Sequence, residues 1–181
     1  MKLARIIISL TICLTLFAVS VISVSAYYLY QYRWKSTSVH YYYDNWIGSR
    51  AISYLGKGAT AWNNTNTPVT ISFGSGNYVY CSVTQSSDSE WDGMVVTTHD
   101  SMYYVKTQSL TLNQNASRTW PNNGALKSVV VHEFGHVLGL ADNGSTATIM
   151  NGFTWGVNGR YEGHMVTTPQ SDDINGVNAI Y

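Results

Sequence analysis

Two histidines and a glutamate lie close together in the segment VVVHEFGHVLGLAD, residues 129–142. His132 and His136 are four residues apart, so an α-helix would present both imidazoles side by side, one turn apart. Two imidazoles placed in this way can share one tetrahedral Zn²⁺ ion. Glu133 would lie beside the metal rather than on it, where its carboxylate can take a proton from zinc-activated water. The spacing therefore predicts a metal-dependent hydrolytic site.

Asp142 completes this arrangement as the third candidate zinc ligand. Gly139 precedes it, and glycine readily adopts a positive φ, which would end the helix and turn the chain back so that Asp142 reaches the metal. Three protein ligands leave the fourth zinc position open for water, as in catalytic sites. The alternative is a pair of core or surface histidines without metal. The chain has only five histidines, so an accidental His-Glu-x-x-His pattern is rare.

The segment before and within the motif predicts a helix that packs against a core. Asn122 or Asn123 can cap its start, because the side-chain oxygen accepts free N–H groups of the first turn. Gly139 ends it. Its apolar face consists of residues at helical spacing, namely Leu126, Val130, Phe134, Val137 and Leu138.

The remaining segments predict the elements that hold this helix in place. A helix is expected over residues 49–64, where apolar residues recur at three- and four-residue steps despite Gly56 and Gly58. A closing helix is expected over residues 171–181, with Ser171 as its N-cap. Strand-like segments lie at 38–44, 69–73, 78–84, 93–99 and 102–113. This order predicts an α+β fold, a mixed twisted sheet with about three helices.

Residues 1–26 differ in kind from the rest of the chain. Lys2 and Arg5 precede an apolar run from Ile6, and the small residues of VSA come before a cleavage position after Ala26. This is the pattern of a secretory signal peptide. The alternative is an uncleaved membrane anchor, because the run is nearly long enough to span a bilayer. We expect cleavage, a single domain over residues 27–181, and a secreted, extracellular protein that is not attached to a membrane.

Charge and cysteine content limit the classes of partner. Lys and Arg together number 10, as do Asp and Glu, and loss of Lys2 and Arg5 with the signal would leave a small negative charge. No basic patch suggests nucleic acid or anionic lipid as a partner. Cys81 is the only cysteine in residues 27–181, so no internal disulfide is expected and Cys81 is predicted to be buried. We expect a monomer.

The zinc motif, extended by Met150, resembles that of the metzincin zinc endopeptidases, whose methionine-containing turn underlies the metal. Within that clan the chain most resembles the matrixins. RWKSTSVHYYYD, the helix with Trp62, VTISFG, the zinc helix and DDINGVNAIY follow one another as in a matrixin catalytic domain. The resemblance implies a zincin-like catalytic domain in which Gly139 and Met150 support the site.

Asp142 departs from the matrixin pattern, which usually has a third histidine at this position. A carboxylate oxygen is an ordinary zinc ligand, so metal binding is expected to persist. The added negative charge predicts a more alkaline pH optimum than a three-histidine site would have. Asp142→His should therefore shift the pH–rate profile toward lower pH, and a profile that matches the parent would contradict this prediction.

Further expectations follow from the resemblance. Matrixin zymogens commonly block the zinc with a propeptide cysteine; no cysteine lies between Ala26 and the catalytic domain, so we expect export without that inhibition. A new N-terminus near Tyr27 would pair with Asp172, and Asp173 would support the Met150 turn; stabilisation of a helix start is the alternative for both acids. Candidates for a structural Ca²⁺ or second Zn²⁺ site are His40, His99 and His164.

These observations predict a secreted zinc metalloendopeptidase that hydrolyses internal peptide bonds of proteins. Its substrate, a protein or peptide, would lie extended along the sheet edge near residues 94–99. Side-chain preference would come from the loop between Asn151 and Thr168, where Tyr161 either contacts substrate or packs. One alternative is a non-catalytic zinc-containing binding protein on the same fold, although such a protein has no use for Glu133. Hydrolysis of a non-peptide amide is the other.

Overall fold

The computed structural model describes residues 27–74, 76, 78–88, 91–144 and 147–181. The segment expected to be a signal peptide, residues 1–26, lies outside this range. In the described part of the chain, no helix is long and apolar enough to cross a membrane.

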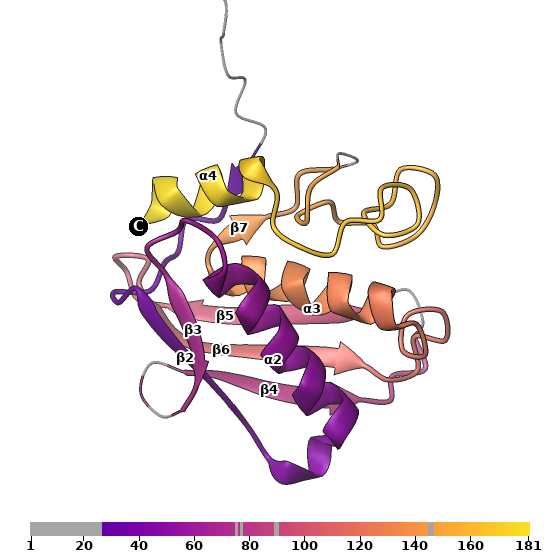
Figure 1. Ribbon diagram of the computed structural model, residues 1–181. Helices are drawn as coiled ribbons and strands as arrows, with labels where there is room; N and C mark the ends of the chain where they lie inside the picture. The colour runs from indigo at the N-terminus through magenta and orange to yellow at the C-terminus, as the bar shows by residue number, and fades with distance from the viewer. Residues whose placement is uncertain (1–26, 75, 77, 89–90, 145–146) are drawn as a thin grey trace, which may run out of the picture.

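A five-stranded mixed sheet forms one layer of the fold (Figure 1). Its strands are β2 (Ser38–Tyr43), β3 (Thr70–Phe73), β4 (Tyr78–Thr84), β5 (Gly93–His99) and β6 (Val105–Asn113). The spatial order is β3-β2-β4-β6-β5, and only β5 runs antiparallel to its neighbour. The mixed sheet is confirmed, and it places β5 at one edge.

Two long helices cover one face of this sheet, and a third lies beyond them (Figure 1). They are α2 (Ser49–Asn63), α3 (Asn123–Val137) and α4 (Ser171–Ile180). A short 3-10 helix, η1 (Asn45–Ile47), leads into α2. The α+β class with about three helices is therefore confirmed, and α3, which carries the histidine motif, is packed between α2 and β5.

Gly58 explains how α2 can carry a glycine in its middle. A Cβ atom at this position would lie 2.6 Å from Cγ1 of Val130 and 2.8 Å from Cδ2 of Phe134, both on α3. A helical glycine costs about 1 kcal/mol relative to alanine. Here it permits close helix packing, and nearby Trp62 donates from Nε1 to the Val131 carbonyl at 2.8 Å. The two helices are thus fixed against each other directly beside the motif.

The predicted start of β6 and the predicted N-cap of α4 are wrong, and local hydrogen bonds explain both. β6 begins at Val105 instead of residue 102, because Asp100 Oδ1 accepts from the N–H groups of Met102 and Tyr104, each at 2.9 Å, and holds a turn. The N-cap of α4 is Gln170, not Ser171. The Gln170 N–H donates to Asp173 Oδ2 at 2.7 Å, which completes a capping box one residue earlier.

A two-stranded pair was not anticipated from the sequence. β1 (Tyr28–Leu29) runs antiparallel to β7 (Leu140–Ala141), which is separated from the end of α3 by two residues. Beyond β1, the Tyr30 N–H donates to the Gly139 carbonyl at 2.8 Å. The start of the described chain is thereby fastened next to the candidate metal site.

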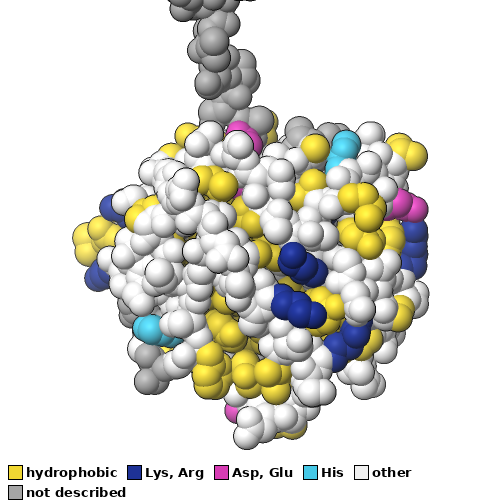
Figure 2. Space-filling view, in the orientation of Figure 1, with side chains coloured by type: hydrophobic (Ala, Val, Ile, Leu, Met, Phe, Trp, Pro, Cys, Tyr) yellow, Lys and Arg dark blue, Asp and Glu magenta, His cyan; other side chains and the backbone are white. Residues whose placement is uncertain are grey.

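Cys81 lies on β4 and is fully buried in the core, as predicted. Burial raises the pKa of its thiol, which makes it unreactive at neutral pH. The surface shown in Figure 2 is mostly uncharged, with a few scattered lysine, arginine and acidic side chains.

Candidate metal and active site

Helix α3 places the two histidines as their spacing predicts. Asn122 caps the helix, and its Oδ1 accepts from the N–H groups of Gly124 and Ala125, each at 3.0 Å. One turn of helix separates His132 from His136, and their ring centroids are 4.5 Å apart. Both imidazoles therefore lie on the same face of α3.

Backbone carbonyls orient both imidazole rings. His132 Nδ1 lies 2.8 Å from the Ile149 carbonyl oxygen, and His136 Nδ1 lies 2.8 Å from that of Leu140. Because each carbonyl accepts a hydrogen bond, Nδ1 must carry the proton in each ring. The Nε2 lone pair of each ring is therefore available for a metal ion. In metal sites, backbone carbonyls commonly orient histidine ligands in this way, by accepting a hydrogen bond from the other ring nitrogen.

The chain reverses after α3 and brings back the third candidate ligand. Gly139 has a φ of 96°, and a Cβ atom there would lie 2.7 Å from the Tyr32 carbonyl oxygen, so glycine is required on both counts. After this turn, Asp142 Oδ1 lies 3.3 Å from His132 Nε2 and 3.5 Å from His136 Nε2. The structure thus brings His132, His136 and Asp142 together.

These three residues have the donor set and spacing of a zinc site. Their ligand atoms all lie within 4.8 Å of one another, and among the described residues no second group of three such side chains is found. Ligands 2.0–2.1 Å from a tetrahedral zinc lie roughly 3.3 Å apart, close to the two distances from Asp142. Burial lowers the pKa of both histidines. Near neutral pH they are therefore neutral ligands rather than cations paired with Asp142.

Glu133 is buried beside this group, with only 3% of its surface exposed. Its Oε2 has no hydrogen-bond partner among the described residues. Burial raises the pKa of Glu133 to about 8, while the positive charge of Arg160 acts in the opposite direction. A pKa near the working pH and an unused oxygen beside the candidate metal group suit Glu133 to accept and release a proton.

Gly93, at the start of β5, makes the room in which Glu133 lies. A Cβ atom at Gly93 would be 2.7 Å from Glu133 Oε1 and 2.8 Å from its Cγ. The position of the carboxylate therefore depends on the absence of a side chain on a strand about forty residues earlier in the sequence.

Gly93→Ala should lower kcat about 10²-fold, because displacing a catalytic carboxylate by as little as 1 Å can have this effect. Zinc content should be unchanged, since the three atoms nearest the added Cβ all belong to Glu133 and none to a candidate ligand. The control is Gly56→Ala on α2, where an added Cβ meets no atom within 4 Å. Full activity of Gly93→Ala would show that the Glu133 position is not critical.

Met150 lies beneath α3, where its Sδ atom is packed closely against Gly135. The turn that carries it is held by Asp173 of α4. Asp173 Oδ2 accepts from the Ile149 N–H at 2.9 Å, and Oδ1 accepts from the Met150 N–H at 3.1 Å. Since the Ile149 carbonyl orients His132, Asp173 connects the closing helix to the metal site.

Asp173→Asn should reduce the free energy of unfolding by about 1.5–3 kcal/mol. The new side-chain amide would place an N–H donor opposite backbone N–H groups, which donate to the carboxylate in the parent, and two donors cannot bond to each other. Water cannot compensate, because only 1% of Asp173 is exposed. A thermal melt beside Asp44→Asn, an exposed aspartate that accepts one hydrogen bond from Tyr80, would measure the difference. Equal melting temperatures of the two variants would contradict this role of Asp173.

The candidate site opens into a cleft of about 430 Å³. Besides the ligands and Glu133, its lining includes the start of β5, the segment Gly152–Trp155, Tyr30 and Arg160. Tyr30, whose ring lies 5.7 Å from that of His136, and Arg160 were not singled out from the sequence. Tyr30 is brought to the cleft by the pairing of β1 with β7. These strands give no periodic pattern in the sequence from which the pairing could be predicted. Arg160 is the only lysine or arginine between Asn151 and Thr168 and could have been noticed in the sequence for that reason.

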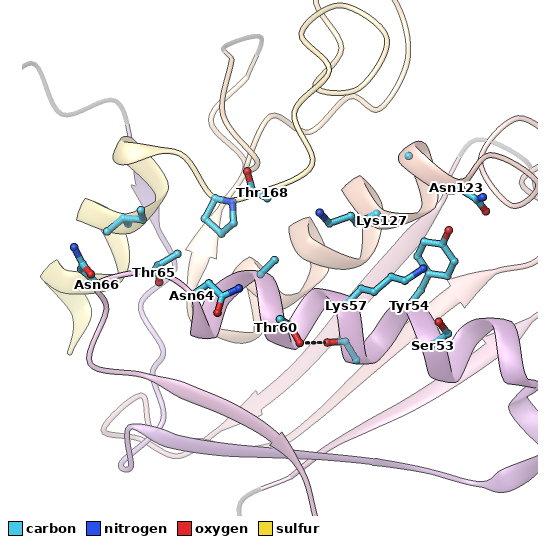
Figure 3. A pocket seen from close by; sticks show the side chains of 15 residues that line it. Ser53, Tyr54, Lys57, Thr60, Asn64, Thr65, Asn66, Asn123, Lys127 and Thr168 are labelled. Atoms are coloured by element: carbon cyan, nitrogen blue, oxygen red, sulfur yellow. Dashed lines mark hydrogen bonds between the residues drawn. The ribbon is translucent and has the colours of Figure 1, made fainter.

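A larger cavity, of about 1080 Å³, lies between α2 and the start of α3 (Figure 3). Lys57 and Lys127 contribute its charged side chains, and neutral polar residues contribute most of the remainder. Among the described residues that line it there is no candidate metal ligand and no carboxylate. The candidate ligands and Glu133 line the smaller cleft, which is therefore the candidate active site.

The other histidines singled out from the sequence do not join the zinc group or another such group among the described residues. His40 Nδ1 lies 3.0 Å from Ser72 Oγ, and His99 Nδ1 lies 2.9 Å from the Asp100 carbonyl oxygen. Tyr161 packs against Gly124 at the start of α3, as in the packing alternative.

Tyr27 lies against Gly176 of α4, one helical turn from Asp172. An ion pair between a new N-terminus and Asp172 stays a prediction, because Ala26 lies outside the described residues.

Comparison with known families agrees with this geometry. The family model described as Matrixin matches residues 50–181, which include β5, the zinc helix, the Met150 turn and α4. A search of the curated proteins finds no significant match. Since the matched residues form well over half of the chain and include all three candidate ligands, the chain belongs to the matrixin family of zinc metalloendopeptidases.

Proposed function

We propose that the protein is a secreted zinc-dependent endopeptidase in which His132, His136 and Asp142 bind zinc and Glu133 is the general base. The observation that carries this proposal is the convergence of three ligand atoms beside a buried carboxylate with an unused oxygen. A structural zinc site would need no such carboxylate, and its fourth ligand would come from the protein.

The roles of the residues follow from their positions. A zinc ion held by the three ligands would polarise the scissile carbonyl and acidify the attacking water. Glu133 accepts a proton from that water and then passes it to the leaving amine. Gly93 leaves space for the carboxylate, and the Ile149 and Leu140 carbonyls keep the imidazoles in the tautomer that binds metal.

The edge strand β5 supports an extended substrate. In the described part of the sheet β5 pairs on one side only, with β6, and its other edge offers backbone groups to a peptide. Met94 and Val96 are about half exposed on this strand. A substrate paired with β5 would pass the metal group in the extended form that hydrolysis of an internal peptide bond requires.

Export is a separate part of the proposal. It rests on residues 1–26, whose basic start, apolar run and small residues before Ala26 are those of a cleavable signal. A mature chain of residues 27–181, acting as a monomer, is the corresponding product. Mass determination of the protein recovered from the medium of producing cells would test the cleavage position.

Cleavage of unfolded casein by the purified, zinc-loaded protein tests the endopeptidase. New internal fragments are expected, and a chelator should prevent their formation. Bound zinc without cleavage of casein or of other unfolded proteins would favour the non-catalytic binding protein. Hydrolysis of small acyl amides in the absence of any protein cleavage would instead indicate a non-peptide amidase.

A further inference from the structure

Arg160 is a buried cation in the wall of the active-site cleft. Only 2% of the residue is exposed, yet it lines the cleft together with Glu133 and Asp142. Its backbone is held on both sides, because its N–H donates to the Phe153 carbonyl at 2.7 Å and its carbonyl accepts from the Val166 N–H at 2.7 Å. The side chain is therefore placed by a fixed segment of the loop between Asn151 and Thr168.

The guanidinium group has more donors than the protein uses. Of its five N–H groups, one on Nη1 donates to the Asn151 carbonyl at 2.9 Å, and Nε is buried without a partner among the described residues. Within those same residues, no carboxylate lies at salt-bridge distance from Arg160. Burying a cation without an ion-pair partner costs several kcal/mol. Such a group in a cleft indicates a ligand that supplies the missing charge.

Arg160 keeps its charge in this environment. Burial lowers the pKa of its guanidinium to about 10, and the carboxylates of Glu133, Asp92 and Asp142 oppose that effect, with Glu133 the strongest. The group is therefore a cation at neutral pH. Glu133 and Asp142 are already engaged in the proposed chemistry, and among the described residues that line the cleft Arg160 is the only lysine or arginine.

We propose that Arg160 binds the carboxylate of an aspartate or glutamate side chain of the substrate, at the residue directly after the scissile bond. This inference rests on the proposed endopeptidase function and names its substrate class, proteins with an acidic residue at that position. The side of the bond follows from the lining of the cleft, where Arg160 lies with Glu133, the group that delivers a proton to the leaving amine, and with the segment Gly152–Trp155 after the Met150 turn. Guanidinium binds carboxylate through paired, charge-assisted hydrogen bonds that an amide cannot reproduce.

The test uses four peptides that differ only in the residue after the scissile bond, which is Glu, Gln, Leu or Lys. The parent should cleave the Glu peptide about tenfold to 100-fold better than the Gln peptide in kcat/KM, as expected for one buried charge-assisted contact. Arg160→Met should remove this ratio, and Arg160→Lys should restore part of it. Lys106→Met, which removes an exposed cation from β6, should leave the ratio unchanged.

A second measurement does not depend on turnover. The Glu133→Gln protein should bind the uncut Glu peptide more tightly than the Gln peptide, and the double variant with Arg160→Met should not. This comparison, and the Glu to Gln ratio of the parent, remain informative if Arg160→Met alone fails to fold.

The outcomes separate the two proposals. Cleavage of the four peptides at similar rates by the parent would overturn the acidic preference and leave the endopeptidase intact. An equal loss for all four peptides in Arg160→Met would also overturn it, because Arg160 would then only support the loop or Glu133. If no peptide and no unfolded protein is cleaved, the endopeptidase function fails, and the preference fails with it.

Discussion

Glu133→Ala should lower kcat for peptide hydrolysis by about 10²–10⁴-fold, the usual contribution of a general base. The reason is that Glu133 is the buried carboxylate next to the three candidate ligands, and its free Oε2 is available to the attacking water. Zinc content should stay at that of the parent, because Glu133 is not among the residues whose ligand atoms converge. Hydrolysis of a quenched fluorescent peptide, with metal analysis of the same samples, measures both quantities.

Two further variants make this result specific. Glu133→Gln keeps the size of the side chain but cannot take up a proton, so it should be as inactive as Glu133→Ala. Glu162→Gln changes an exposed glutamate whose Oε1 lies 3.1 Å from Nη2 of Arg118, and it should keep near-parental activity. An active Glu133→Gln enzyme would rule out the proton-accepting role and would require another group to activate the water.

His136→Ala should reduce zinc affinity by more than the roughly 100-fold that loss of an outer hydrogen-bond partner can cause, because a direct ligand is removed. Activity should disappear at zinc concentrations that saturate the parent. Stability should change as well, since zinc that binds only the folded protein at 1,000 times its Kd contributes about 4.1 kcal/mol. For a chain of this size, that corresponds to a rise in Tm of roughly 8–16 °C.

Thermal melts with zinc and with excess chelator measure this contribution directly. The parent should show a large difference in Tm between the two conditions, and His136→Ala should show little. His164→Ala is the matched control, because His164 is exposed and lies outside the group of candidate ligands. If His136→Ala kept the parental response to zinc, the ion would have to be bound elsewhere.

An acidic preference at Arg160 would connect these two predictions to a substrate class. Zinc and Glu133 supply chemistry that any extended peptide could use, whereas Arg160 adds a requirement on the side chain next to the bond. The same cleft would thus contain both the residues for hydrolysis, which are the zinc ligands and Glu133, and Arg160, which would select the substrate side chain. Because Arg160 does not belong to the zinc group, its substitution should alter the choice among peptides while zinc remains bound.

The sequence alone determined the features that depend on short-range geometry. His132 and His136 share a helix face because they are four residues apart, an asparagine at 122 or 123 could be expected to cap that helix, and Gly139 allows the turn after it. The α+β class also followed, since helical and strand-like periods are local properties of the chain. Even the error at the start of α4 was local, because the side chain of Asp173 moved the cap by one residue.

Only the tertiary structure decided which distant residues complete the site. Gly93, Tyr30 and Arg160 reach the cleft through the packing of β5 against α3, the pairing of β1 with β7 and the course of the loop after Met150. Such contacts join residues tens of positions apart, and their selection depends on how the whole core packs rather than on local periodicity or spacing. The proposed zinc ligands and Glu133 could therefore be predicted from one helix and its following turn, whereas the residues that line the cleft around them could not.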